Sequence, residues 1–219
     1  MSIEFSKVEF GDNPEPRCPC VLLLDTSGSM AGSPIDELNA GLQVLSQSLA
    51  QDELAQLRVE LAIITFGPAN LMQDFVGAGQ FSPPHLSASN DTPMGTAINL
   101  ALDKIDERKQ VYKQNGVAYY RPWIFLITDG EPTDGDIWKS AAQRVRDAET
   151  KKKVAFFSVG VQSANMAVLS QISIREPLML QGLNFRDLFV WLSASLSNVS
   201  HSKPGDEVPL PSPTSWATV

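Results

Sequence analysis

The chain has 219 residues, of which 43% are hydrophobic and 19% are charged. This composition can form a sizeable core and is not that of a disordered protein. The formal net charge of -8 argues against a general nucleic-acid binder, because neutralising phosphates requires clustered lysine and arginine. The basic run at residues 151–153 precedes an apolar segment, and we interpret it as the solvated end of a helix.

The N-terminal stretch "MSIEFSKVEFGDNPEPRCPC" lacks the basic start and apolar run of a signal peptide. No apolar run approaches the roughly 20 residues that span a bilayer. Cys18 and Cys20 lie too close along an extended chain to bridge easily, and one C-x-C pair is a weak zinc signal. We interpret both cysteines as unreactive thiols at a strand edge, and we expect a cytoplasmic protein without a membrane partner.

The first elements are a strand and an amphipathic helix. Residues 21–24 form an apolar run without alternation, which is typical of a parallel strand buried on both faces. Ser33 followed by Pro34 predicts a helix with Ser33 as its cap. The helix carries apolar residues at helical spacing, namely Ile35, Leu38, Leu42, Leu45 and Leu49.

The next segments predict a hairpin and a long helix. "RVELAIITF" (58–66) and "LMQDFVG" (71–77) are strands joined by the short turn "GPAN", which favours antiparallel pairing. Residues 78–91 form a loop rich in proline and serine. Thr92 and Pro93 then begin a helix that extends to about Gln114.

The second half repeats the alternation. "WIFLIT" (123–128) is a fully apolar strand, and a helix follows from about Ile137 to Lys151. "VAFFSVG", a short helix near 164–171 and the strand "PLMLQ" come next. The closing amphipathic helix is marked by Phe185, Leu188, Phe189, Leu192 and Leu196.

This alternation predicts an α/β fold: a doubly wound, mostly parallel sheet with one antiparallel edge strand and helices on both faces. We divide the chain into an N-terminal extension (1–16), one domain (17–200) and a C-terminal tail (201–219). The tail has four prolines and cannot continue the last helix. We expect it to lie extended and to hold Trp216 against the domain or a partner.

Two aspartates follow apolar strands directly. Asp25 and Asp129 should emerge at the same edge of the sheet, where ligands bind in open parallel sheets. Ser27, Ser29 and Thr92 are hydroxyl residues expected at that edge. An oxygen-only cluster of this kind suits a hard divalent cation, Mg²⁺ first, with Mn²⁺ or Ca²⁺ as alternatives. No histidine or cysteine is placed to favour zinc.

Simpler interpretations exist for each residue. Asp, Ser and Gly are ordinary turn residues, Ser29 alone could be structural, and Thr92 before proline is a good helix cap. We interpret Asp134 as a turn or cap residue. Asp91 and Glu131 are interpreted as solvated loop charges.

The motifs "DTSGSM", "NDTPMG" and "ITDGEPTD" resemble, in order, the three motifs of the metal-ion-dependent adhesion site of von Willebrand factor type A domains. The resemblance covers about residues 17–200. It implies a doubly wound sheet with one antiparallel edge strand. It further implies that Ser27, Ser29 and Thr92 bind the cation through their hydroxyls, or Thr92 through water. Asp25 and Asp129 would bind it directly or through water, and a partner protein would supply an acidic ligand.

Within this family, "RCPCVLLLDTSGSM", "NDTPMGTAI", "TDGEPTDGD" and the tail "VPLPSPTSWATV" are similar to the small bacterial TerY-like proteins. Those are intracellular domains associated with tellurium-resistance operons and with a protein kinase and phosphatase. The resemblance implies a non-catalytic, cation-dependent interaction module. Its expected role is to dock or scaffold a kinase or phosphatase in tellurium resistance or stress response.

Enzyme classes fit less well. A haloacid-dehalogenase phosphotransferase needs a second carboxylate two residues after the first aspartate, where Ser27 stands. A serine hydrolase would want G-x-S-x-G and a histidine base, but the only histidines are His85 and His201. Phosphate-loop and dinucleotide motifs are missing. The alternative that we retain is a cation-dependent phosphohydrolase.

Overall fold

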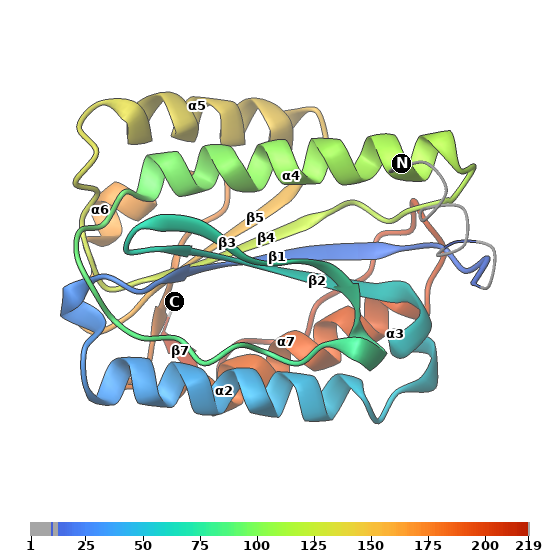
Figure 1. Ribbon diagram of the computed structural model, residues 1–219, viewed down its shortest axis with the longest axis horizontal. Coiled ribbons are helices and arrows are strands. Elements are labelled where there is room, and N and C mark those ends of the chain that lie inside the picture. The colour runs from blue at the N-terminus through green and yellow to red at the C-terminus, as the bar shows by residue number, and fades with distance from the viewer. Residues whose placement is uncertain (1–9, 11–12, 219) are drawn as a thin grey trace.

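The computed structural model describes residue 10 and residues 13–218. Most of the predicted N-terminal extension, residues 1–9 and 11–12, therefore lies outside the described residues. The described strands form one seven-stranded sheet in the order β3-β2-β1-β4-β5-β6-β7 (Figure 1). Their bounds are β1 Cys18–Asp25, β2 Val59–Phe66, β3 Ala69–Gly77, β4 Trp123–Thr128, β5 Ala155–Gly160, β6 Leu178–Leu180 and β7 Ala217–Thr218.

The five inner strands are parallel, and the two edge strands are antiparallel to their neighbours. Only Gly67 and Pro68 separate β2 from β3, a link too short for the crossover that parallel strands require. The predicted fold class and the hairpin are confirmed. The sheet has a second antiparallel edge strand, β7, which the sequence analysis did not predict.

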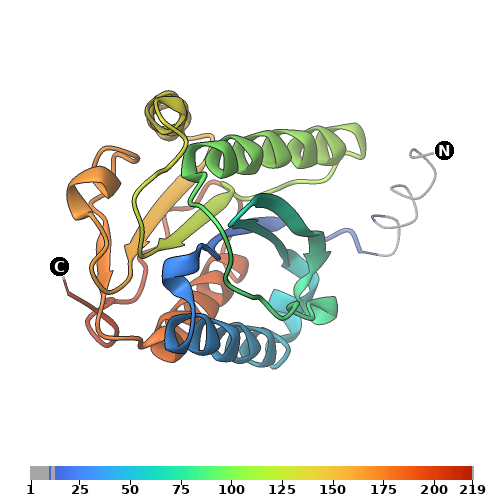
Figure 2. The same ribbon diagram turned by 60° about the vertical axis from the view of Figure 1, so that its left-hand side comes forward.

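Helices cover both faces of the sheet (Figure 2). One face carries α2 (Ser33–Leu49), α3 (Glu53–Arg58) and α7 (Phe185–Ser200). The other carries α4 (Met94–Gln114), α5 (Ile137–Thr150) and α6 (Met166–Leu169). Two short 3-10 helices, η1 (Gly28–Met30) and η2 (Ala78–Gln80), lie in the connections.

Strand β1 shows why its sequence has no alternation. Leu22 and Leu24 contribute to the core under α2 and α7, whereas Val21 and Leu23 contribute to the core under α4 and α5. Both faces are buried, so every position from Cys18 to Leu24 is apolar, and only the last residue, Asp25, is charged. Cys18 and Cys20 lie on the same strand as free, buried thiols.

Two details differ from the sequence expectations. Helix α3 was not predicted; Asp52 caps it, with Oδ1 accepting bonds from the backbone N–H groups of Leu54 and Ala55, both at 3.0 Å. Ser33 is the first residue of α2 and not its cap. That position belongs to Gly32, whose φ of 82° lies in the left-handed region that glycine tolerates.

The basic run also has a defined place. Helix α5 ends at Thr150, and all three lysines at 151–153 are exposed, which confirms the solvated helix end. Among the described residues, no helix is both long and apolar enough to cross a membrane.

The tail returns to the domain. Trp216 is fully buried, and its ring centroid lies 5.3 Å from that of Trp191 on α7. The Trp191 Nε1–H donates to the carbonyl of Pro211 at 2.8 Å. Residues Ala217–Thr218 then pair with β6. The expectation that Trp216 would be held against the domain is confirmed.

Candidate functional site

Asp25 ends the inner strand β1 and is buried. Its Oδ1 accepts the backbone N–H of Ser27 at 2.8 Å, and its Oδ2 accepts the Thr128 hydroxyl. Burial raises the pKa of Asp25 above its ordinary value, and the negative charge of Asp129 acts in the same direction. The hydrogen bonds from Ser27 and Thr128 oppose that shift. This carboxylate is held at a fixed place with little solvent around it.

Strand register explains why Asp25 and Asp129 meet. Leu24 of β1 pairs with Ile127 of β4, so Asp25 lies level with Thr128, and Asp129 follows at once. The loops after both strands lie at the same end of the sheet (Figure 1). The predicted shared edge is therefore confirmed by the register.

The two serines connect the loop after β1 to Asp129. Ser27 Oγ lies 3.0 Å from Ser29 Oγ, and the Ser29 hydroxyl donates to Asp129 Oδ1 at 2.7 Å. Between them, the Gly28 N–H donates to the Asn90 carbonyl at 3.0 Å. This backbone bond ties the serine loop to the loop that carries Thr92.

Thr92 is buried and does not cap α4. The N-cap position belongs to Pro93, and no side-chain cap bond is formed there. Backbone bonds instead fix Thr92: its N–H donates to Thr133 Oγ1 at 3.0 Å, and its carbonyl accepts the Thr133 N–H at 2.9 Å. The cap interpretation of Thr92 is therefore wrong. Its hydroxyl is left for another role.

Gly130 shows where that hydroxyl points. A Cβ placed on Gly130 would lie 3.3 Å from Thr92 Oγ1 and 3.6 Å from Asp25 Oδ2. Thr92 and Asp25 thus border one small space that a larger residue at position 130 would fill. Gly130 was not predicted from the sequence, although it directly follows Asp129.

Asp134 caps α4 from a neighbouring loop. Its Oδ2 accepts the backbone N–H of Thr96 at 2.7 Å and the Thr96 hydroxyl at 3.0 Å. The interpretation of Asp134 as a cap residue is confirmed. Asp91 and Glu131 are exposed, as expected, and Glu131 accepts a hydrogen bond from Asn165 at 2.7 Å.

The structure brings all five predicted residues to one edge of the sheet. Hydrogen bonds of 3.0 and 2.7 Å hold the side-chain oxygens of Ser27, Ser29 and Asp129 close together. Within the described part of the chain, no three His, Cys, Asp or Glu side chains form a possible metal site. The cluster combines two carboxylates with three hydroxyls, a donor set suited to a hard cation.

The histidines lie elsewhere. His201 Nε2 is 3.1 Å from Asp52 at the start of α3. His85 is an exposed loop residue, and neither histidine forms a hydrogen bond to the oxygen cluster.

Comparison with solved structures shows a shared fold. The pilus adhesin SpaC of Lactobacillus rhamnosus GG, in its open conformation, matches with a TM-score of 0.66 and 12% identity over 85% of this chain and 31% of that chain. Proximal thread matrix protein 1 from the mussel byssus matches with a TM-score of 0.58 and 13% identity, covering 84% and 49%. A form of the mussel protein with a zinc-occupied MIDAS motif gives 0.56 and 14%, again covering 84% and 49%.

This chain spans half or less of the length of those proteins. A search of curated proteins returned no match. The family model of the von Willebrand factor type A domain, by contrast, matches residues 20–187, from β1 into α7. Because that match covers most of the chain and the fold agrees with it, the chain belongs to the von Willebrand factor type A domain family.

Proposed function

We propose that this protein is a non-catalytic interaction module that binds a partner protein through a divalent cation. The observation that carries the proposal is the run of close oxygens from Ser27 through Ser29 to Asp129, beside the buried carboxylate of Asp25. The proposed cation ligands, direct or through water, are Asp25, Ser27, Ser29, Thr92 and Asp129. The zinc-occupied MIDAS motif of the mussel protein, which shares this fold, supports a cation-binding role for the chain.

The five proposed ligands would contribute to cation binding in two ways. Ser27, Ser29 and Thr92 present neutral hydroxyls. Asp25 and Asp129 supply the two negative charges, with Asp25 oriented by the Thr128 hydroxyl. A bound Mg²⁺ would add a positive charge with an exchangeable ligand position, which a partner's Asp or Glu could take. We propose Mg²⁺ as the resident ion, with Mn²⁺ or Ca²⁺ as alternatives.

The loops around the cluster would set partner specificity. They comprise residues 26–32, 81–93 and 129–136, and backbone bonds tie them together. The Ser89 N–H donates to the Thr26 carbonyl at 2.7 Å, in addition to the Gly28–Asn90 and Thr92–Thr133 bonds. A recognition surface built on a rigid frame of this kind loses little conformational entropy on binding.

The narrower role rests on the resemblance of the sequence motifs to TerY-like proteins. We infer a cytoplasmic module that docks a protein kinase or phosphatase in tellurium resistance or a related stress response. A kinase or phosphatase partner would contribute the acidic ligand from an exposed loop.

Titration calorimetry with Mg²⁺ and with Mn²⁺ tests the cation site. We expect one site in the wild type and no binding by Asp129→Ala. Asp136→Ala is a matched control, because Asp136 is an exposed aspartate at the start of α5, outside the cluster. Equal binding by wild type and Asp129→Ala would contradict the proposed site.

Partner capture tests the second half of the proposal. Partner binding should fall sharply in EDTA and recover with added Mg²⁺. Sustained Mg²⁺-dependent hydrolysis of a phosphomonoester, lost in Asp25→Ala, would overturn the non-catalytic assignment and support a phosphohydrolase.

A further inference from the structure

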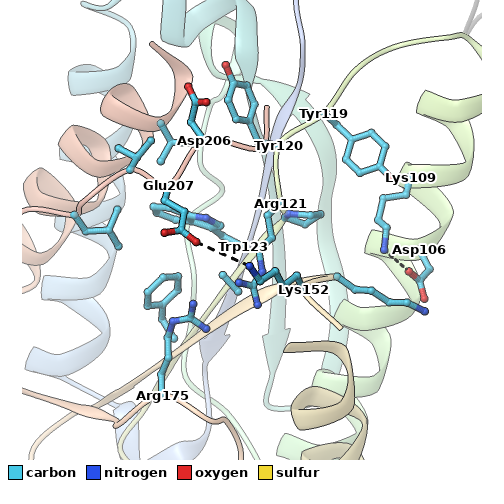
Figure 3. Close-up of a pocket in the computed structure, with 18 of the residues that line it drawn as sticks. Asp106, Lys109, Tyr119, Tyr120, Arg121, Trp123, Lys152, Arg175, Asp206 and Glu207 are labelled. Atoms are coloured by element: carbon cyan, nitrogen blue, oxygen red, sulfur yellow. Dashed lines mark hydrogen bonds and ion pairs between the residues drawn. The ribbon is translucent and has the colours of Figure 1, made fainter. Parts of the chain in front are cut away.

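A cleft of about 920 Å³ is lined by the residues drawn in Figure 3. It lies at the amino ends of β4 and β5, whereas the oxygen cluster lies at the carboxyl ends of β1 and β4. Its lining residues come from the C-terminal half of α4, the segment that leads into β4, the segment after α5 with β5, Arg175 before β6, Val199 of α7 and the tail at 205–210. A ligand there would not touch the proposed cation site.

The lining is basic, although the protein is acidic. Six of the 17 lysines and arginines line this cleft, against three acidic residues, in a chain with a net charge of -8. The basic residues are Lys109, Lys113, Arg121, Lys152, Lys153 and Arg175. Positive charge gathered at one place in an acidic protein favours an anionic ligand.

Contacts with Glu149 and its neighbours orient two arginines of the cleft, Arg121 and Arg175. Arg121 donates from Nη2 to the Glu149 carbonyl at 3.1 Å and from Nε to the Val154 carbonyl. Arg175 pairs with the buried Glu149 carboxylate, and its guanidinium lies 5.2 Å from the centre of the Phe157 ring. These bonds engage only some of the five N–H donors of each guanidinium.

The two guanidinium groups also repel each other. The pKa of Arg121 is lowered, by burial first and then by the charge of Arg175. An anion bound beside them would relieve this repulsion. Glu149 offsets part of this charge, and the guanidinium groups that it helps to orient keep the fixed donor geometry that suits carboxylate recognition.

The chain's own tail lies along the mouth of the cleft. Asp206 and Glu207 are among the lining residues, and Glu207 Oε1 lies 3.9 Å from Lys152 Nζ (Figure 3). Both side chains of this pair are more than three-quarters exposed, so the contact is weak. The Glu207 carboxylate thus already lies near a basic residue of the cleft without binding it tightly, whereas Asp206 Oδ2 accepts the backbone N–H of Lys203 at 2.9 Å.

We propose that this cleft is a second binding site, which takes an extended acidic segment of a partner protein in competition with tail residues 205–207. The positive charges are spread over several elements, with Lys109 on one side of the cleft and Arg175 on the other (Figure 3). Charges spread in this way match successive carboxylates along a peptide better than one compact phosphate. The Glu207 carboxylate beside Lys152 shows the same pairing of charges at the mouth of the cleft.

Fluorescence anisotropy with a short labelled peptide rich in Asp and Glu tests the site. The titration is done in EDTA, so that a cation in the oxygen cluster cannot hold the peptide. We expect wild-type binding to weaken about tenfold in Lys153→Glu and in Lys113→Glu, because each variant removes a cleft charge. Lys151→Glu is the matched control, since Lys151 is exposed in the same lysine run but does not line the cleft.

A second pair of variants tests the competition. The double variant Asp206→Asn with Glu207→Gln should bind the peptide more tightly than the wild type. Glu37→Gln with Glu53→Gln changes the net charge equally at exposed positions on α2 and α3, away from the cleft, and should bind as the wild type does.

Three results would overturn the proposal. One is equal loss of binding in Lys151→Glu and Lys153→Glu, which would assign the effect to net charge. Another is failure of both the wild type and the tail double variant to bind the peptide. The third is binding of pyrophosphate without binding of the peptide, which would assign the cleft to small phosphates.

Discussion

The Ser29 hydroxyl donates a hydrogen bond to Asp129 Oδ1 at 2.7 Å across 100 positions of sequence. Ser29 lies in η1 after β1, and Asp129 lies in the loop after β4. Their contact depends on β1 and β4 being neighbours in the sheet, with carboxyl ends at one edge. A cation placed between these oxygens would bridge two loops that the sheet already holds together.

The first prediction concerns Ser29→Ala. Ser29 is exposed, so its removal should change the free energy of unfolding in EDTA by less than about 0.5 kcal/mol. Mg²⁺ at 100 times its Kd should stabilise the wild type by about 2.7 kcal/mol, and this gain should vanish in the variant. Urea unfolding with and without Mg²⁺ measures both quantities. Ser33→Ala is the control, because Ser33 is exposed at the start of α2, and it should keep the stabilisation by Mg²⁺. Full stabilisation of Ser29→Ala by Mg²⁺ would exclude Ser29 as a ligand.

The second prediction concerns the tail. Trp216→Ala should lower the free energy of unfolding by about 3 kcal/mol, because it leaves a cavity beside Trp191. Truncation after Lys203 should cost at least as much, since it also removes β7. Trp138→Ala is the comparison, because Trp138 on α5 is only partly buried and should cost less. Unchanged melting of the truncated chain would show that the tail does not stabilise the domain.

The third prediction concerns a buried carboxylate on β2. Glu60 accepts hydrogen bonds from Arg17 at 3.1 Å, from Arg108 at 2.8 Å and from the Tyr112 hydroxyl. Glu60→Gln would leave two guanidinium groups without their shared countercharge, so it should cost about 3 kcal/mol or more in chemical unfolding.

Glu107→Gln is the control for Glu60. Glu107 pairs with Lys104 at 2.9 Å, but its side chain is 66% exposed, so the loss should stay below about 1 kcal/mol. Similar losses in the two variants would mean that burial does not strengthen the Glu60 network.

The fourth prediction concerns thiol chemistry. Burial raises the pKa of Cys18 to about 12, and Glu60 adds to the shift; burial also raises the pKa of Cys20. Because the thiolate is the reactive form, neither cysteine should react with a thiol reagent at neutral pH unless the protein unfolds. Rapid labelling of the native protein would contradict the buried positions in β1.

The raised pKa of Cys18 also predicts that the free energy of unfolding depends on pH. The unfolded chain ionises its thiols near pH 9.0, whereas folded Cys18 keeps its proton to about pH 12. The folded state therefore binds more protons in this range, and stability should fall as the pH rises from 9 towards 12. Cys18→Ala should reduce this decrease of stability with pH. Urea unfolding of both proteins between pH 9 and 12 measures the decrease. An unchanged decrease in the variant would mean that other groups cause it.

The sequence by itself determined the alternation of strands and helices and the motif residues at strand ends. Apolar runs such as residues 21–24 identify strands buried on both faces, because each of their side chains enters a core. Asp25 and Asp129 could be assigned to one edge because parallel strands end together. Helix α3 was not predicted, because its six residues are too few to show a helical period of apolar positions.

Only the tertiary structure decided the contacts between segments far apart in the chain. Thr92 before Pro93 is a good cap by local rules, but the backbone bonds to Thr133 and the cap from Asp134 free its hydroxyl. The pairing of β7 with β6 and the basic cleft likewise depend on distant segments. Local sequence encodes periodicity and turn chemistry, whereas side-chain contacts across 41 or 100 positions depend on how the sheet is assembled.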